Sequence, residues 1–500
     1  MDQKGTENRN LTLATAPPPA LICREGVRGS GIVHLGFGNF HRAHLAIYTA
    51  KAVAEEGGDW GIIGYSHRSS LRDVMQQQDF LYSVIELSPN SEKVCIPAIH
   101  TEILSDENPW EVVDAIAMQS IRIVSLTITE AGYCINQRTG DLDVGKAELA
   151  ADLSRISPPK TAIAQVAFGL LKRAKTHGEP IAVMSCDNVA GNGDVTRQAV
   201  LGFAKRLSDD FDRQTLLLYV NRKVSFPNSM VDRIVPRTTR THKQIAAARL
   251  GVKDQLVVPA EEFTMWIIED DFIAGRPNWD RHGAVFTDEV AAYEVLKLRL
   301  LNGTHSLIAY LGALSGCETI SSSRLSLSIE LAARELIYKE YLPTLTIPSG
   351  LNIDRYIGDL FSRWGNTVLA DKVARVGSDG SMRLPQRITE PVQHHMAGGK
   401  LPEFICLMVA AYLACIAPPG GFDPGSYAAE MTDPEAISLR NIAASSVSYH
   451  QYVRKVFKET DIFSKELAKF DKFVERIGDY LEVLCTEDVK TAVEMASNVS

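Results

Sequence analysis

The first half of the chain contains short runs of almost uninterrupted apolar residues, and these runs limit the possible folds more than any other feature. They cover residues 31–38, 60–66, 81–87, 121–129 and 180–186. Continuous apolar strands are buried on both faces, as in a parallel sheet that helices cover on either side. Several of the runs are separated by segments of helical length and pattern. We therefore expect an α/β domain with a parallel sheet.

The pattern changes at about residue 288. Beyond it come long stretches with helical periodicity, at residues 293–314, 325–341, 402–416 and 463–484. This change predicts two domains, an α/β domain over residues 29–287 and a mainly α-helical domain over residues 288–500. Residues 1–28 are polar, contain several prolines and lack apolar periodicity, so we expect a flexible tail there.

Charge and cysteine content exclude several classes of protein. The 500 residues carry a net charge of -9, which opposes broad attraction to nucleic acid or to anionic membrane surfaces. The apolar run at residues 404–417 is too short to cross a bilayer and predicts a buried helix. Eight cysteines lie scattered without a CxxC pair, and no secretory signal is visible. We expect a cytoplasmic protein without nucleic acid or membrane partners.

A pair of glycines follows the first apolar run. A glycine turn between a strand and a helix lets backbone N–H groups approach a pyrophosphate, which indicates a Rossmann-type dinucleotide-binding domain. His41 stands where the usual fingerprint has a third glycine, so a simple tight turn is the alternative interpretation. The expected cofactor-binding residues of this turn are Gly36, Phe37, Gly38, Asn39 and Phe40.

The segment after the second apolar run bears on the choice between NAD and NADP. In NAD-specific folds an acidic residue there binds the adenosine ribose, whereas a basic residue can accommodate a 2'-phosphate. Here the strand leads into Arg68, and no acid appears before Asp73. We therefore expect Arg68 to contact the cofactor and leave both NAD and NADP open. An exposed basic loop without a ligand is the alternative.

A strongly apolar helical stretch at residues 293–305 contains Lys297, Asn302 and His305. At about 100° per residue, Lys297 and His305 lie about 80° apart and Asn302 about 60° beyond His305, so all three can address one cavity. An apolar environment lowers the pKa of a lysine toward that of a general base. Asn302 can donate to a developing oxyanion, and His305 can orient lysine or substrate. Taken singly, each residue also has a purely structural explanation: the lysine can extend its amine to solvent, the asparagine can cap a helix, and the histidine can be hydrogen-bonded in the core.

Longer motifs carry a family resemblance. The segments IVHLGFGNFHRAH (32–44), VMSCDNVAGNG (183–193) and KLRLLNGTHS (297–306) resemble the long-chain, zinc-independent polyol dehydrogenases, and the resemblance extends over nearly the whole chain from about residue 30. It implies that Lys297 is the general base, that Asn302 and Asn188 are oxyanion donors, and that His305 is the orienting group.

The resemblance implies further site residues. Glu294 corresponds to a proton relay beside Lys297, and Asp232 and Arg375 match contacts to polyol hydroxyls. Arg383 stands where the family has a lysine, and arginine is not a neutral replacement for lysine at a geometrically demanding contact. We expect all four to lie at the substrate site.

These features together predict an NAD(P)-dependent oxidoreductase that interconverts an open-chain polyol and its ketose, with D-mannitol and D-fructose as the first pair. Fructuronate reductase (D-mannonate oxidoreductase), acting on a ketouronate, is the runner-up because segments 314–320 and 383–392 resemble it. A nucleotide-binding regulator without turnover is an alternative from another class. A zinc-dependent alcohol dehydrogenase is not expected, since histidines and cysteines show no ligand spacing, and we expect no metal.

Overall fold

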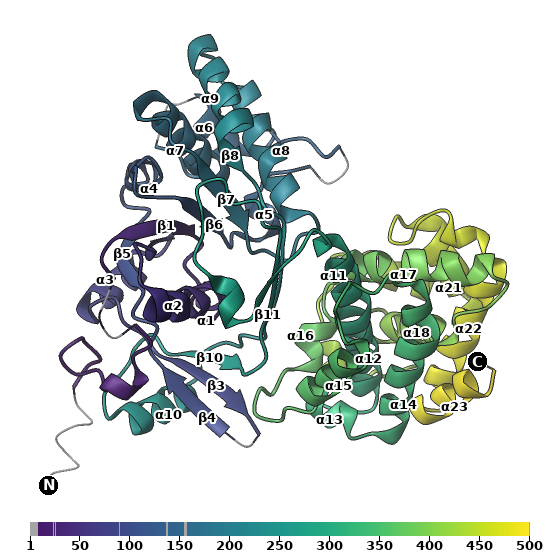
Figure 1. Cartoon of the computed structure of the whole chain (residues 1–500). Coiled ribbons are helices and arrows are strands. Elements are labelled where there is room, and N and C mark those ends of the chain that lie inside the picture. Colours follow the sequence, from purple (N-terminus) through teal and green to yellow (C-terminus); the bar gives the residue numbers. More distant parts are fainter. Residues whose placement is uncertain are drawn as a thin grey trace, which may run out of the picture. The chain divides into compact units, whose positions relative to one another are not determined.

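The computed structural model describes residues 9–23, 25, 27–89, 91–136, 139–154 and 158–499. Its contacts divide the chain into two compact units, Met1–Ala291 (unit 1) and Ala292–Ser500 (unit 2), which Figure 1 shows in purple to teal and in green to yellow. Unit 1 combines strands and helices, whereas the named elements in the described part of unit 2 are all helical. This is the Rossmann-like α/β domain followed by a mainly α-helical domain that the sequence predicts.

The central sheet of unit 1 has six parallel strands in the order β5-β2-β1-β6-β7-β8. Successive residues of β1 face opposite sides: Ile32 packs in the core cluster that includes residues of α2, and Val33 packs in the cluster formed with α4 and α7. Both faces are therefore buried, as expected for continuous apolar strands. The strands are β1 Ser30–Leu35, β2 Gly61–Ser66, β5 His100–Ser105, β6 Ile123–Leu126, β7 Ile181–Ser185 and β8 Val224–Ser225.

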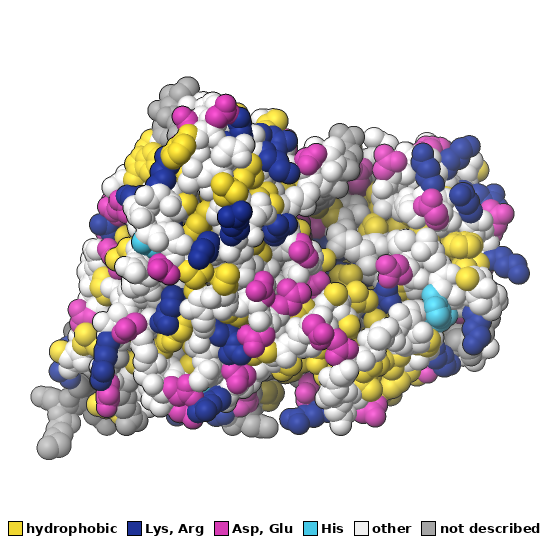
Figure 2. Space-filling view, turned by 45° about the horizontal axis from the view of Figure 1, so that its top comes forward, with side chains coloured by type: hydrophobic (Ala, Val, Ile, Leu, Met, Phe, Trp, Pro, Cys, Tyr) yellow, Lys and Arg dark blue, Asp and Glu magenta, His cyan; other side chains and the backbone are white. Residues whose placement is uncertain are grey.

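Helices connect these strands and form the layers on the two faces of the sheet (Figure 1). They are α1 Asn39–Ala43, α2 Leu45–Glu56, α3 Ser69–Gln77, α4 Trp110–Ile116, α5 Thr129–Gly132, α6 Ala147–Ser154, α7 Ala162–Thr176, α8 Asn192–Lys205 and α9 Asp210–Lys223. A further helix, α10 Arg240–Leu250, follows the last strand of this sheet in the chain. In the view of Figure 2, acidic and basic side chains are interspersed over the molecular surface.

One predicted strand belongs to a different sheet. The apolar run 81–87 contributes β3 Val84–Ser88, which pairs with β4 Ser91–Cys95 and β10 Val258–Glu261 in a separate three-stranded sheet. Apolar character predicts that a strand is buried but does not specify its partner. The central sheet instead contains β5. The first three residues of β5 are polar, and the second and third are at least partly exposed, so the strand does not stand out as an apolar run in the sequence. A third sheet combines β9 Ser229–Asp232, β11 Met265–Ile268 and β12 Ala284–Phe286.

The expectation of a flexible tail over residues 1–28 needs correction for the described part, while residues 1–8 lie outside the described residues. The amide of Leu11 donates to the Lys253 carbonyl oxygen at 2.8 Å, and the amide of Ile22 donates to the Ile96 carbonyl oxygen at 2.9 Å. The side chain of Leu11 is fully buried. The segment is held largely by backbone pairing, for which side-chain periodicity gives no signal.

The core of unit 2 forms around α18 Glu403–Ile416, all of whose residues are buried. It packs against α12 Thr304–Leu314 and α22 Asp471–Thr486, as predicted for the apolar run 404–417. Within the described residues, no helix has the length and apolar character needed to cross a membrane. Other elements of unit 2 are α14 Leu327–Glu335, α15 Ile353–Trp364, α16 Val373–Gly377, α17 Gly380–Ala397, α21 Tyr449–Glu459 and α23 Val489–Val499.

Candidate active site

The glycine pair forms the turn after β1 at the carboxyl edge of the central sheet. Gly36 has a φ of 97°, which side chains rarely adopt, and a Cβ there would collide with the carbonyl oxygen of Thr127. Gly38 has an ordinary φ, and a Cβ there would lie 3.6 Å from the Gly36 carbonyl oxygen, with otherwise open space within 4 Å. Gly36 therefore shapes the turn, whereas the space beside the backbone at Gly38 is open.

The backbone amides of this turn serve two purposes. The N–H groups of Gly36 and Phe37 both donate to the carbonyl oxygen of Tyr65, at 3.2 and 3.0 Å, and the ring of Phe37 is buried. Asn39 and Phe40 open α1, where a helix leaves its first N–H groups without an internal partner. The amides of Asn39 and Phe40 thus stand at the N-terminus of α1, while Phe37 packs beneath the turn.

The loop after β2 presents the candidate contact for the adenosine end of the cofactor. Arg68 is exposed and precedes α3, and its amide donates to the hydroxyl oxygen of Ser66 at 3.1 Å. The residue therefore stands just after the end of β2, a strand that adjoins β1.

Asn188 is exposed after β7, two strands from the glycine turn and on the same edge of the sheet. The neighbouring Asp187 fixes this edge: its carboxylate accepts the amides of Ile128 and Thr129, each at 2.9 Å, and the hydroxyl of Tyr133 at 2.6 Å. Asp187 thereby ties the loop after β7 to the loop after β6. The sequence analysis did not single it out, although it stands beside Asn188 in the same motif.

Three histidines beneath the glycine turn form a buried group that the sequence analysis missed, which we call the histidine cluster: His34, His41 and His100. The rings of His34 and His41 stack with centroids 3.5 Å apart, and the Nε2 atoms of His41 and His100 lie 3.0 Å apart. His34 also makes contacts through Nδ1 with the Ser125 hydroxyl at 2.8 Å and through Nε2 with the Thr127 hydroxyl at 3.0 Å.

Burial controls the protonation of the histidine cluster. It lowers the pKa of His34 to about 3, against which the Gly36 carbonyl oxygen acts weakly. Burial lowers the pKa values of His41 and His100 well below 6.5, and their charged neighbours, including Arg42, act in the same direction. The contact between His41 and His100 requires one nitrogen to donate and the other to accept, so a proton added to the acceptor would break it.

The other expected residues are divided between the two units. Asp232 lies in unit 1, buried at the end of β9 and opposite Met265 in the antiparallel pair with β11. Glu294 lies half-buried in α11 Val290–Leu296, and Lys297, Asn302 and His305 follow it in unit 2.

Lys297 begins an unusual segment. Residues Lys297–Gly303 form a π-helix, η3, which continues α11 and leads into α12. The side chain of Lys297 is largely buried, the residue being 8% exposed, and Asn302 is half-buried. The angles calculated from the sequence assumed an α-helix and need correction, because a π-helix bonds i to i+5 and each residue advances the turn by less than 100°. Short π-helical segments occur frequently at functional sites.

Packing against a second π-helix accounts for the glycine within η3. A Cβ at Gly303 would collide with the hydroxyl of Tyr341, which lies in η4 Leu336–Tyr341, also a π-helix. The tyrosine is fully buried. Gly303 therefore allows the two π-helices to approach closely, a requirement that becomes visible only in three dimensions.

His305 lies in α12 among charged side chains. Its Nε2 is 3.8 Å from a carboxylate oxygen of Asp371, whose two oxygens also accept from Arg375 at 2.7 and 2.5 Å. Burial lowers the pKa of His305 to about 4; Asp371 acts in the opposite direction, and Arg375, Arg387 and Arg363 lower it further. The imidazole is therefore neutral near pH 7 and has one donor and one acceptor nitrogen.

The two arginines expected at the substrate site already have partners within unit 2. Arg375 is 66% exposed on the side chain and pairs with Asp371. Arg383 is 42% exposed on the side chain, donates to the Ser378 carbonyl oxygen at 3.0 Å and pairs with Asp379 at 3.1 Å. Through Asp371, Arg375 is connected to His305, whereas Arg383 lies near a further arginine, Arg387.

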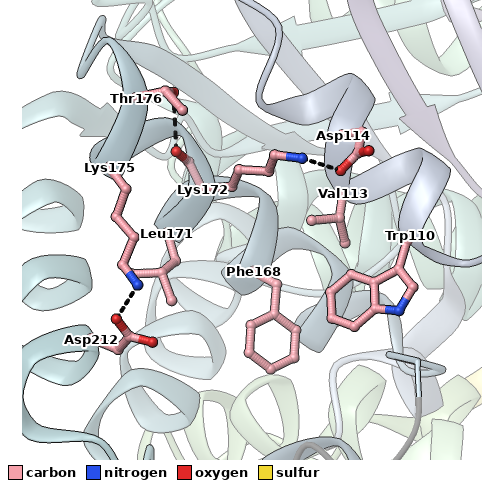
Figure 3. A pocket seen from close by; sticks show the side chains of 9 residues that line it. All are labelled: Trp110, Val113, Asp114, Phe168, Leu171, Lys172, Lys175, Thr176 and Asp212. Atoms are coloured by element: carbon pink, nitrogen blue, oxygen red, sulfur yellow. Dashed lines mark hydrogen bonds and ion pairs between the residues drawn. The ribbon is translucent and has the colours of Figure 1, made fainter.

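Unit 1 also has an open cavity of about 540 Å³ on the outer surface of α4, α7 and α9, shown in Figure 3. Trp110 and Phe168 line its apolar part, and Lys172 pairs with Asp114 at 2.6 Å at its rim. Lys175 likewise pairs with Asp212. None of the expected site residues lines this cavity, so it is separate from the candidate site.

Across the described residues, no three His, Cys, Asp or Glu side chains come together in a position to hold a metal ion. The fold and the site define a two-domain oxidoreductase with a nicotinamide dinucleotide cofactor. Family models support this class: the mannitol dehydrogenase Rossmann domain matches residues 30–281, and the mannitol dehydrogenase C-terminal domain matches residues 289–485. The chain belongs to the mannitol dehydrogenase family.

Individual relatives match over most of their length. D-mannonate oxidoreductase of Escherichia coli (strain K12) is 35% identical over 473 residues, which cover 93% of this chain and 95% of the relative. Polyol:NADP oxidoreductase of Gluconobacter oxydans is 34% identical over 412 residues, covering 81% and 83%. The solved structure of Pseudomonas fluorescens mannitol 2-dehydrogenase with NAD and D-mannitol has a TM-score of 0.83 and 30% identity, covering 98% and 100%.

Proposed function

We propose that this protein catalyses the reversible NAD(P)-dependent oxidation of a secondary alcohol on an open-chain polyol, with Lys297 as the general base. D-mannitol and D-fructose are the first pair to test. The observation that carries the proposal is the largely buried Lys297 in a π-helix, followed by Asn302 and His305. The similarity to a mannitol 2-dehydrogenase solved with NAD and D-mannitol supports the substrate class.

The glycine turn fits the dinucleotide. The open space at Gly38 and the first amides of α1 suit its pyrophosphate, and Arg68 suits the ribose of NAD or the 2'-phosphate of NADP. When bound, the nicotinamide ring supplies or accepts the hydride. Both cofactors remain to be tested, since one relative is named for NADP and another was solved with NAD.

The protein side chains remove the proton of the substrate hydroxyl and stabilise the charge on its oxygen. Lys297 Nζ takes the proton of the substrate hydroxyl, and the amide groups of Asn302 and Asn188 donate to the oxygen as it becomes negative. The neutral ring of His305 orients the hydroxyl, and Glu294 passes the proton between Lys297 and solvent. In ketone reduction the same groups act in reverse. Asp232, Arg375 and Arg383 would bind the remaining hydroxyl groups.

A sugar acid is the second candidate substrate, as in the fructuronate and D-mannonate pair. The guanidinium groups of Arg363, Arg375 and Arg387 all act electrostatically on His305, against one carboxylate, Asp371. Arg375 is paired with Asp371, whereas Arg387 has no carboxylate partner among the described residues, and its charge favours an anionic substrate. The 35% identity to a D-mannonate oxidoreductase is consistent with this candidate.

An assay of purified protein tests the proposal. Oxidation of NADH and NADPH is followed at 340 nm with fructose, fructuronate and tagaturonate as ketones, and the reverse reaction is followed with mannitol and mannonate. We expect turnover with at least one ketone and its alcohol. Binding of NADH or NADPH without turnover on any of these compounds would instead favour a nucleotide-binding regulator.

The two glycines of the turn allow a matched test of the cofactor site. We expect Gly36→Ala to lower the free energy of unfolding by about 2 kcal/mol or more, because it combines a strained φ with a backbone collision. Gly38→Ala should change stability by less than about 0.5 kcal/mol yet weaken NADH binding, because its methyl group occupies open space. Urea denaturation and NADH fluorescence titration measure the two effects. Unchanged NADH affinity in Gly38→Ala would contradict the assignment.

A further inference from the structure

Helix α17 carries two arginines one turn apart, Arg383 and Arg387. Residues at i and i+4 lie on the same face of a helix, so both side chains leave α17 in the same direction. Arg383 is partly exposed and paired with Asp379, whereas Arg387 is 9% exposed. The proposed function assigns Arg383 to the substrate hydroxyl groups and uses Arg387 only as a positive charge near His305.

Among the described residues, the buried guanidinium of Arg387 has no carboxylate partner. Its Nη1 donates to the hydroxyl of Ser306, and its Nε has no hydrogen-bond partner among the described residues. The charged and titratable groups that act on it are two tyrosines, Tyr310 and Tyr341, and Arg383. Burial lowers its pKa to about 10, so the group is still a cation near pH 7. A buried cation without a counterion is costly unless an anion joins it.

Arg387 lies close to His305, one of the proposed catalytic residues. Its partner Ser306 follows His305 directly in α12, and the guanidinium acts electrostatically on the His305 ring. The chain as a whole has a net charge of -9, whereas the surroundings of His305 are positively charged. A small anion bound beside His305 would balance them.

We propose that Arg387, with Arg383 one turn away, binds the carboxylate of an open-chain sugar acid and so determines specificity for an acidic substrate; this inference rests on the proposed function. The side of a guanidinium that carries Nε is flat and matches the two oxygens of a carboxylate. One buried guanidinium edge suits this planar group better than a tetrahedral phosphate, which usually takes several donors.

Variants at position 387 test this role in the full-length protein. Steady-state reduction is measured with fructuronate, with neutral fructose and with fructose 6-phosphate. The wild type should prefer fructuronate. Arg387→Met should lower kcat/KM for fructuronate about 100-fold, mainly through KM, and change kcat/KM for fructose less than threefold. Arg387→Lys keeps the charge but loses the flat edge, so it should recover part of the activity on fructuronate. Arg355→Met, on the exposed side of α15, is the control.

Melting measurements on the wild type keep the test independent of how well the variants fold. With cofactor present, D-mannonate should raise the melting temperature at concentrations at which D-mannitol has no effect. Equal losses on fructose and fructuronate in Arg387→Met, or a preference for fructose 6-phosphate, would overturn the inference. Turnover of fructose but of neither ketouronate would overturn it and leave the proposed function intact. No turnover with any ketone would refute the proposed function itself.

Discussion

Replacing Lys297 by methionine is expected to lower kcat for ketone reduction about a thousandfold at pH 7, with little change in NADH binding. Methionine keeps most of the volume of the buried side chain and removes the amine. A general acid or base contributes about 100- to 10,000-fold to a rate, and here hydride transfer and proton transfer must accompany each other. The nucleotide site in unit 1 keeps its own residues, so its affinity should persist.

The second π-helix provides the matched control. Lys339 lies in η4, is 45% exposed on its side chain and pairs with Glu335, so Lys339→Met also removes a lysine from a π-helix, but one at the surface. Its kcat should stay within about twofold of the wild type. A Lys297→Met enzyme with more than a tenth of wild-type kcat would refute the assignment.

The sequence predicted the features of the fold that depend on local pattern. The glycine turn could be located because a strand, a glycine pair and a helix follow one another within a few residues around Gly36. The strand at 81–87 was assigned to the wrong sheet because its partner, β10, is about 170 residues further along the chain. An apolar run contains no information on a partner at that distance.

In the candidate site, too, local patterns could be recognised from the sequence and long-range contacts could not. Lys297, Asn302 and His305 could be recognised together because they are close in sequence and stand out in an apolar helix. The π-helical geometry and the close approach of Gly303 to Tyr341 could not be recognised, since they are visible only in the folded chain. Arg387 was missed because an arginine on a helix is normally a surface residue, and only the fold shows that it is buried without a carboxylate.

The histidine cluster predicts a steep loss of stability in acid. His34, His41 and His100 are neutral in the folded protein well below pH 6.5, whereas the unfolded chain takes up protons on them at about 6.5. Their lowered pKa values therefore cost nothing above about pH 7, and stability falls as the pH drops toward the folded-state values. His34, with a folded-state pKa of about 3, contributes about 1.4 kcal/mol per pH unit over this range, or about 2 kcal/mol at pH 5.

His41 and His100 act in the same direction, so the loss of stability at pH 5 exceeds the contribution of His34 alone. We expect the urea midpoint of unit 1 to fall steeply between pH 6.5 and 5. Tryptophan fluorescence reports mainly on this unit, since four of the five tryptophans lie in it, at positions 60, 110, 266 and 279. His100→Gln removes one titrating ring, so its stability should decline with a shallower slope, whereas the exposed His67→Gln should keep the wild-type slope.

The location of the histidine cluster makes this acid sensitivity relevant to the cofactor. His34 stands two residues before Gly36 and His41 three residues after Gly38, so protons that separate the stacked rings also disturb the turn between them. NADH affinity should therefore decline over the same pH range as the stability of unit 1, and His100→Gln should make both declines shallower. Equal pH slopes in the wild type and in His100→Gln would show that other groups control the acid response.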